Sequence, residues 1–239
     1  MAIVKEVQIG DQRLILGDCI SVMPTLGRFD AVVTDPPYGI SYKPRAMRPG
    51  KRREHAAIYG RKEIHGDSIA PDVTGLLHLA NEAIIWGGNY FADQLPPKAS
   101  WLVWDKKGGN ASFHGATTFA DCELAWCSDG RPAMIHQQIW SGLVRQGIEA
   151  SAPRCHPTQK PIALMEWCLK RLPKAKTILD PFMGSGTTLV ACQRMGRHGT
   201  GIELDEGYFE IACKRVRDAY AQPDLFIAPP EKPVQEVLL

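Results

Sequence analysis

The chain has 239 residues, a formal net charge of +2, and apolar and charged fractions of 44% and 23%, which are typical of an ordinary folded domain. No apolar run approaches the ~20 residues that a membrane helix needs, and residues 1–10 lack the layout of a signal peptide, so we expect a cytoplasmic protein with no membrane partner. The scattered cysteines form no zinc-ligand pattern, so neither a metal site nor a disulfide framework is expected.

Apolar runs and turn residues predict alternating strands and helices. The first part of the chain predicts strands at 13–16, 29–34, 83–86, 101–104, 122–127 and 134–140, and a helix at 73–80. The second part predicts a helix from Pro161, a strand at 176–179, a helix at 187–195, a strand at 199–203 and a helix at 206–220. This alternation favours an α/β fold with a mostly parallel sheet. We expect a single domain at 1–221 and a loosely held, proline-containing tail at 222–239.

Asp35-Pro36-Pro37-Tyr38 directly follows the predicted strand 29–34. Asp35 should therefore lie at the carboxyl end of a strand, where open α/β sheets bind ligands. The two prolines fix φ and remove two N–H donors, which leaves a rigid elbow with a carboxylate, a free carbonyl and an aromatic ring. Such an elbow can bind a flat group bearing an amine, although a Pro-Pro turn with a capping Asp explains the tetrapeptide equally well.

Basic residues are concentrated in a stretch at 41–65 that begins three residues after this elbow. A basic run is usually a solvated surface loop, but beside a pocket it also suits a phosphate backbone. We interpret 41–65 as a loop that can face a phosphate-backbone ligand. The residues assigned to contacts with such a backbone are Lys43, Arg45, Arg48, Lys51, Arg52 and Arg53.

A glycine-containing loop at 180–187 links a predicted strand to a predicted helix. Glycine lets such a loop turn tightly and lets a ligand approach the backbone, and the helix start offers N–H groups to an anion. The loop lacks the lysine of a phosphate-binding loop, and Leu189 stands where a dinucleotide fingerprint has its third glycine, which disfavours a nicotinamide-dependent oxidoreductase. Glu203 ends the next strand, where an acid can accept hydrogen bonds from ribose hydroxyls. A ligand with a ribose but no pyrophosphate, such as S-adenosylmethionine, fits both features.

Taken together, these motifs resemble those of the DNA amino-methyltransferases, which methylate adenine N6 or cytosine N4. The tetrapeptide at 35–38 resembles the catalytic motif, and 180–187 resembles the cofactor motif. Catalytic before cofactor is the motif order of the permuted beta class. The segment 156–161, His-Pro-Thr-Gln-Lys-Pro, resembles the motif ahead of the cofactor loop, and Gly17-Asp18 resembles the acidic site for the cofactor's adenine. The resemblance spans residues 13–218.

The resemblance implies a circularly permuted, seven-stranded, Rossmann-like sheet of the S-adenosylmethionine-dependent methyltransferase type. It also implies that residues 107–155 are the target-recognition region. The catalytic residues would be Asp35, Pro36, Pro37 and Tyr38. The cofactor-binding residues would be Asp18, Asp180, Pro181, Phe182, Gly184, Ser185, Gly186, Thr187, Glu203 and Lys160.

The implied substrate is double-stranded DNA, and the basic stretch at 41–65 would be its DNA-facing loop. The target base must leave the stack, with Tyr38 stacked on it, while Asp35 and the Pro36 carbonyl accept the two N–H groups of its amine. Asp at the first motif position favours adenine N6, because the cytosine-N4 enzymes of the family more often have Ser there. A cytosine-N4 enzyme and a non-catalytic DNA-binding relative remain the alternatives. A homodimer and a cognate restriction enzyme are left open as partners.

Overall fold

The computed structural model describes residues 2–41, 67–97, 100–109, 120–141, 144–147, 149 and 159–222. Several predictions concern residues outside these ranges. They are the DNA contacts of Lys43, Arg45, Arg48, Lys51, Arg52 and Arg53, the first three residues of the motif at 156–161, and the tail from 223 onward.

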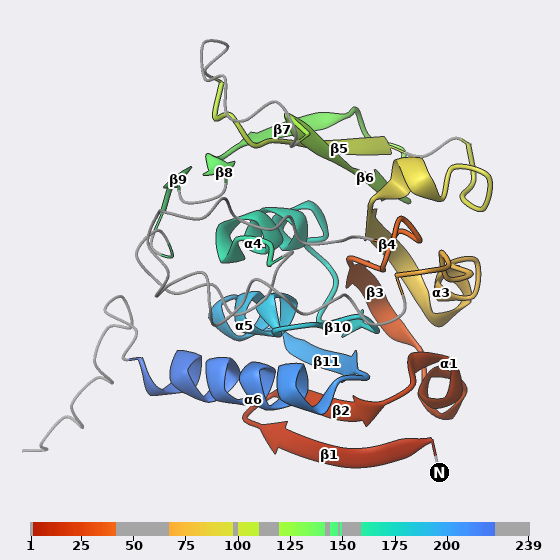
Figure 1. Ribbon diagram of the computed structural model, residues 1–239, viewed down its shortest axis with the longest axis vertical. Helices are drawn as coiled ribbons and strands as arrows, with labels where there is room; N and C mark the ends of the chain where they lie inside the picture. Colours follow the sequence, from red (N-terminus) through yellow and green to blue (C-terminus); the bar gives the residue numbers. More distant parts are fainter. Residues whose placement is uncertain are drawn as a thin grey trace, which may run out of the picture.

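The described residues form one nine-stranded sheet and a separate two-stranded sheet (Figure 1). The strand order of the large sheet is β1 (Ile3–Ile9), β2 (Gln12–Gly17), β11 (His198–Glu203), β10 (Thr177–Asp180), β3 (Phe29–Thr34), β4 (Ala80–Trp86), β6 (Cys122–Cys127), β5 (Ser100–Asp105) and β7 (Met134–Gln137). The five strands from β2 to β4 in this order are parallel to one another. β1 is antiparallel to β2, and β6 is antiparallel to both β4 and β5. The predicted α/β fold with a mostly parallel sheet is confirmed.

The expected count of seven strands is too low. β1 is the strand of the large sheet that the residue pattern did not indicate, because it lies at the edge of the sheet and exposes the adjacent charged residues Lys5 and Glu6. It pairs with β2 across a turn in which Gly10 has a φ of +53°. The predicted strand 134–140 divides into β7 and the short β8 (Trp140–Ser141), which pairs with β9 (Val144–Arg145).

Helices cover both faces of the sheet (Figure 1). α4 (Ile162–Arg171), α5 (Thr187–Arg194) and α6 (Glu206–Ala221) pack on one face, where Leu164, Leu189 and Phe209 are fully buried. α1 (Cys19–Val22), α3 (Leu76–Leu79) and the 3-10 turn η2 (Gly88–Tyr90) lie on the other face. α3 is shorter than the predicted helix at 73–80: residues 73–75 lie in a turn closed by the hydrogen bond from Leu76 N–H to the Val73 carbonyl at 3.1 Å, and β4 begins at Ala80. Within the described ranges, no helix has the length and apolar character needed to cross a bilayer.

The chain leaves β10 and β3 in opposite directions, although these two strands are neighbours. After β10 it passes through α5 to β11, toward β2; after β3 it continues to β4, on the other side. Asp30 locks the pair, because its Oδ2 accepts the backbone N–H groups of Lys176 and Thr177 at 2.8 and 2.9 Å. Ligands of open α/β sheets bind at such a reversal, outside the carboxyl ends of the strands. The fold therefore directs attention to Asp35 and Asp180.

Candidate active site

Asp35 directly follows β3, and donors occupy both oxygens of its carboxylate. The Tyr38 hydroxyl donates to Oδ1 at 2.7 Å, and the Lys160 Nζ lies 2.5 Å from Oδ2. Burial raises the pKa of Asp35, and the ammonium of Lys160 opposes that rise. A carboxylate held in this way is oriented, and it can accept a hydrogen bond or a proton once a donor gives way.

The ring of Tyr38 is held between aromatic and backbone neighbours. It stacks on Tyr90 with ring centroids 4.7 Å apart and planes 14° apart, and it meets the edge of Phe91 at 6.4 Å. Gly87 has a φ of +70°, and a Cβ there would lie 2.1 Å from the Tyr38 ring, so only glycine fits this position. The sequence motif therefore becomes a fixed aromatic surface beside a carboxylate.

Lys160 connects Asp35 to a second carboxylate, Glu123, on β6. The Lys160 Nζ lies 3.1 Å from Glu123 Oε2, and the Lys106 Nζ lies 2.7 Å from Glu123 Oε1. Lys160 also lies 5.5 Å from the centre of the Trp86 ring. Here the ammonium of Lys160 partners Asp35, so its predicted contact with the cofactor stays a prediction. The sequence interpretation missed Glu123 and Lys106; the available signal was a carboxylate at the second residue of an otherwise apolar strand.

Asp180, the last residue of β10, is a buried carboxylate, only 3% exposed. Thr34 Oγ1 donates to its Oδ1 at 2.7 Å, and the backbone N–H of Phe182 donates to the same oxygen at 3.2 Å. Burial raises the pKa of Asp180 to about 6, against the effect of its hydrogen bonds from Thr188 and Thr34. Among the ion pairs of the described residues, none involves Asp180. Its charge is therefore available to a cationic ligand.

The loop after Asp180 turns through Gly184 and Gly186, with φ of +51° and +76°. A Cβ on Gly186 would lie 2.9 Å from Ala212 Cβ, so a side chain there would press on α6. Arg215 of α6, which the sequence interpretation missed, holds the loop from outside. It donates to the Ser185 carbonyl at 2.7 Å, to Ser185 Oγ at 2.9 Å and to Thr187 Oγ1 at 3.0 Å. The N-terminus of α5, at Thr187, is thus presented at the end of a fixed loop.

Two further predicted acids lie at the ends of the next strands. Burial raises the pKa of Glu203, at the end of β11, and one of its oxygens accepts the Asp205 N–H at 2.8 Å. Asp18 follows β2 and is exposed, and its carboxylate caps α1 through Ile20 N at 3.2 Å and Ser21 Oγ at 3.0 Å.

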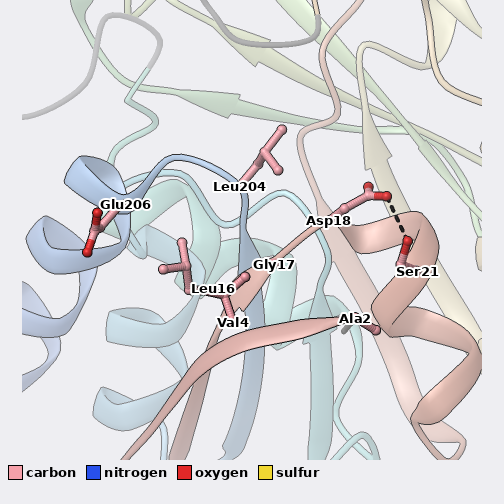
Figure 2. Close-up of a pocket in the computed structure, with 8 residues that line it drawn as sticks. All are labelled: Ala2, Val4, Leu16, Gly17, Asp18, Ser21, Leu204 and Glu206. Atoms are coloured by element: carbon pink, nitrogen blue, oxygen red, sulfur yellow. Dashed lines mark hydrogen bonds between the residues drawn. The ribbon is translucent and has the colours of Figure 1, made fainter.

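An open pocket of about 400 Å³ lies at the carboxyl end of β2 (Figure 2). Figure 2 shows Asp18 turned toward Ser21 at this end of the strand. The residues lining the pocket are Ala2, Val4, Leu16, Gly17, Asp18, Ser21, Leu204 and Glu206. The pocket adjoins Glu203, because Leu204 is the next residue in the chain.

These carboxylates fit the cofactor that the sequence indicated. Asp180, Glu203 and Asp18 follow or end the adjacent strands β10, β11 and β2. S-adenosylmethionine carries an ammonium group, ribose hydroxyls and an adenine amine, all of which donate to carboxylates. Within the described residues, no three or more His, Cys, Asp and Glu side chains cluster closely enough to hold a metal ion. The fold and the arrangement of these carboxylates fit a protein that binds S-adenosylmethionine.

Comparison with known proteins finds similarity to DNA methyltransferases. A family model for N6/N4 methyltransferases, described as DNA methylase, matches residues 129–214. The type II methyltransferase M2.DpnII of Streptococcus pneumoniae is 42% identical over 120 residues, which are 48% of this chain and 41% of that protein. The type II methyltransferase M.HinfI of Haemophilus influenzae is 24% identical over an alignment that covers 94% of this chain and 75% of that protein. Residues 129–214 are thus similar to the N6/N4 DNA methyltransferases, and the chain spans less than half the length of the relative that it matches at 42% identity.

A solved structure agrees on the fold. The cytosine-N4-specific PvuII DNA methyltransferase superposes with a TM-score of 0.51, covering 92% of this chain and 95% of that chain. At 14% identity this similarity establishes the architecture alone.

Proposed function

We propose that this protein methylates the N6 amine of adenine in double-stranded DNA, on a base rotated out of the helix. The observation that carries the proposal is the Asp35 carboxylate, fixed beside the Tyr38 ring at the end of β3 and one strand away from Asp180. An acceptor for an amine, an aromatic surface for a base and an acid for a cationic cofactor thus lie at the same edge of the sheet.

The chain's own groups activate the amine by positioning it. The exocyclic nitrogen is a poor nucleophile, because its lone pair is delocalised into the ring. Asp35 and the Pro36 carbonyl accept its two hydrogens and draw the nitrogen toward tetrahedral geometry, and Pro37 keeps the elbow rigid. S-adenosylmethionine, when bound, supplies an electrophilic methyl carbon whose bond to sulfur breaks as the bond to nitrogen forms. Asp35 then takes a proton from the cationic product, a task that its raised pKa favours.

The base itself would stack on Tyr38. Base–aromatic stacking is worth about 1–3 kcal/mol per base. In the structure Tyr90 covers one face of Tyr38, and the Tyr90 side chain is 46% exposed. A base that stacks on this face takes the place of Tyr90, which has solvent into which it can move.

The cofactor would lie along the carboxyl ends of β10, β11 and β2. Asp180 and the loop of Pro181, Phe182, Gly184, Ser185, Gly186 and Thr187 would hold its methionine end. Glu203 would accept from the ribose hydroxyls, and Asp18 from the adenine amine. The DNA would contact the predicted basic residues at 43–53, and residues 107–155 would read the target sequence. A homodimer and a restriction partner remain predictions.

Adenine is preferred over cytosine because the first residue of the catalytic motif is Asp35. The amines of adenine and cytosine need the same two hydrogen-bond acceptors, so the target base must be identified from the methylated nucleoside. Purified protein with labelled S-adenosylmethionine should methylate duplex DNA, and digestion to nucleosides should yield N6-methyladenine. Recovery of N4-methylcytosine would show that the target base is cytosine, while amino-methylation of DNA would stand.

Asp35→Ala should abolish methyl transfer and leave cofactor binding intact, because Asp35 contacts the amine and not the cofactor. Methyl transfer and cofactor affinity are measured on the same preparation, with Glu6→Gln, a change at the distant β1–β2 edge, as the control variant. Full activity of the Asp35→Ala protein would refute the assigned role. Absence of any methyl transfer by the unchanged protein, with cofactor bound, would favour a non-catalytic DNA-binding relative.

A further inference from the structure

Both oxygens of Asp35 already have a donor in the arrangement described above. Oδ1 accepts from Tyr38, and Oδ2 is paired with Lys160 at 2.5 Å. An arriving amine either shares an oxygen with one of these donors or displaces it, and only displacement of Lys160 leaves the full charge of Asp35 to the amine. The Tyr38 hydroxyl is neutral. Lys160 carries a full positive charge, and its side chain is only 6% exposed.

A buried ammonium that loses its counter-ion is strongly disfavoured, so Lys160 can leave Asp35 only if another anion receives it. Glu123 is already in place. Its Oε2 lies 3.1 Å from the same Nζ, so a small movement of Lys160 exchanges one carboxylate for the other. The Glu123 side chain is itself only 24% exposed, which keeps this interaction strong.

Glu123 is also prepared to keep its negative charge. Lys106 lies 2.7 Å from its Oε1, so the carboxylate is held from the side opposite Lys160. Burial would raise the pKa of Glu123, but the two lysines outweigh it and bring the pKa to about 2. Glu123 therefore stays ionised when Asp35 exchanges its partners.

We propose that Glu123 is a positioning residue of the methyl-transfer reaction: it receives Lys160 from Asp35 when the target amine binds, and so frees Asp35 Oδ2 for the amine. The inference rests on the proposed function. Glu123 touches neither base nor cofactor in this scheme and acts through Lys160 alone.

Glu123→Gln tests the proposal, because the amide keeps the size of the side chain and loses its charge. Lys160 would then have Asp35 as its one remaining carboxylate in this cluster, and the amine would compete with it. We expect the single-turnover rate of methyl transfer to fall about 10- to 100-fold, the range for loss of one hydrogen bond to a charged group. Cofactor affinity and melting temperature should stay close to those of the unchanged protein, and Glu6→Gln is the control.

Two measurements separate this role from a purely structural one. First, Glu123 raises the pKa of Asp35, which also faces Lys160, Tyr38 and Asp180, so its removal should move the acidic limb of the rate–pH profile to lower pH. Second, if Glu123 acts only through Lys160, adding Glu123→Gln to Lys160→Met should cost nothing further.

A Glu123→Gln protein with the rate and pH profile of the unchanged protein would overturn the inference while methyl transfer itself stands. Fully additive losses in the double variant would overturn it as well. If Glu123→Gln does not fold, Glu123→Asp replaces it: the charge is kept but its reach is shortened, so a slower rate with an unchanged limb is expected. A Glu123→Asp rate equal to that of the unchanged protein would count against the proposal. Failure of the unchanged protein to methylate DNA would instead count against the proposed function.

Discussion

At the scale of single residues, the acids of this site do different work because their surroundings differ. Asp35 has a lysine beside it, whereas Asp180 is buried with hydroxyl and backbone donors alone. The pKa of Asp180 is therefore raised to about 6, because burial disfavours its charge and no cation is among the groups that offset it. Binding of a cation beside Asp180 should favour loss of the proton from this carboxyl group.

The affinity for S-adenosylmethionine should therefore fall as the pH drops from 7 to 5. Binding a cation favours the ionised carboxylate, and below a pKa of about 6 the free protein must first release a proton, at a cost approaching tenfold in affinity per pH unit. Isothermal titration across this range measures the slope. Asp180→Asn should bind weakly and with a smaller slope; Glu203, whose pKa is also raised, accounts for what remains. An affinity that is constant from pH 5 to 7 would contradict the assignment of Asp180 to the cationic end.

Whether a site residue could be predicted from the sequence depended on how close its partners lie along the chain. Asp35, Tyr38, Asp180 and Glu203 could be found because each lies in a short motif at the end of an apolar run. The pairing of Lys160 with Asp35 could not, because 125 positions separate the two residues and the pairing depends on how β3 and α4 pack. Glu123 and Arg215 were missed for the same reason: each lies in an element of its own, outside any motif.

At the scale of elements, the glycine loop depends on a close contact between two helices. Gly186 precedes α5 with a positive φ and faces Ala212 of α6. Gly196 also has a positive φ, of +62°, but a Cβ there would have open space around it. Comparing alanine substitutions at the two glycines therefore distinguishes the cost of backbone strain from the cost of steric crowding.

Gly186→Ala should destabilise the protein more than Gly196→Ala. Both changes place alanine in the left-handed region, at about 1–2 kcal/mol, and Gly186→Ala adds overpacking of about 1–3 kcal/mol. Denaturant unfolding gives the free energies, and only the change at Gly186 should also weaken cofactor binding. Equal losses in the two variants would show that the contact with α6 carries no cost.

Elements were predicted best where their residues alone decide them. β3 and β6 begin and end where their apolar runs do, at 29–34 and 122–127. β1 was missed because its charged residues reflect an edge position, which only the pairing with β2 reveals. The helix at 73–80 was overextended at both ends: residues 73–75 form a turn before α3, and at residue 80 pairing with β3 overrides helical propensity.

At the scale of the whole molecule, a buried ion pair joins the end of α4 to the segment between β6 and β7. Arg171 grips Asp129 with two bonds, Nε to Oδ2 at 2.6 Å and Nη2 to Oδ1 at 2.8 Å. Both side chains are less than a tenth exposed. The pair therefore connects α4 to the segment after β6, near the edge of the sheet formed by β6, β5 and β7.

Arg171→Met should lower the free energy of unfolding by about 2–3 kcal/mol, because Asp129 loses its buried partner, although Arg131 remains 2.6 Å from it. Arg194→Met is the matched control: its pair with Glu166 is longer, at 3.5 Å, and both side chains are more than a fifth exposed. Loss of that pair should cost no more than about 1 kcal/mol. Denaturant midpoints and slopes provide both values, and similar losses would contradict a structural role for Arg171.

The strand order has a consequence for how the protein is made. The parallel neighbours of β2 and β3 on the cofactor side are β11 and β10, which begin at 198 and 177. During translation, both early strands must therefore keep an unpaired edge until residues 177–203 have left the ribosome. Unpaired edges invite association with other chains, and pairings this distant in sequence form slowly. The arrangement that brings β3 and β10 side by side thus leaves the nascent chain with an exposed strand edge until β10 is synthesised.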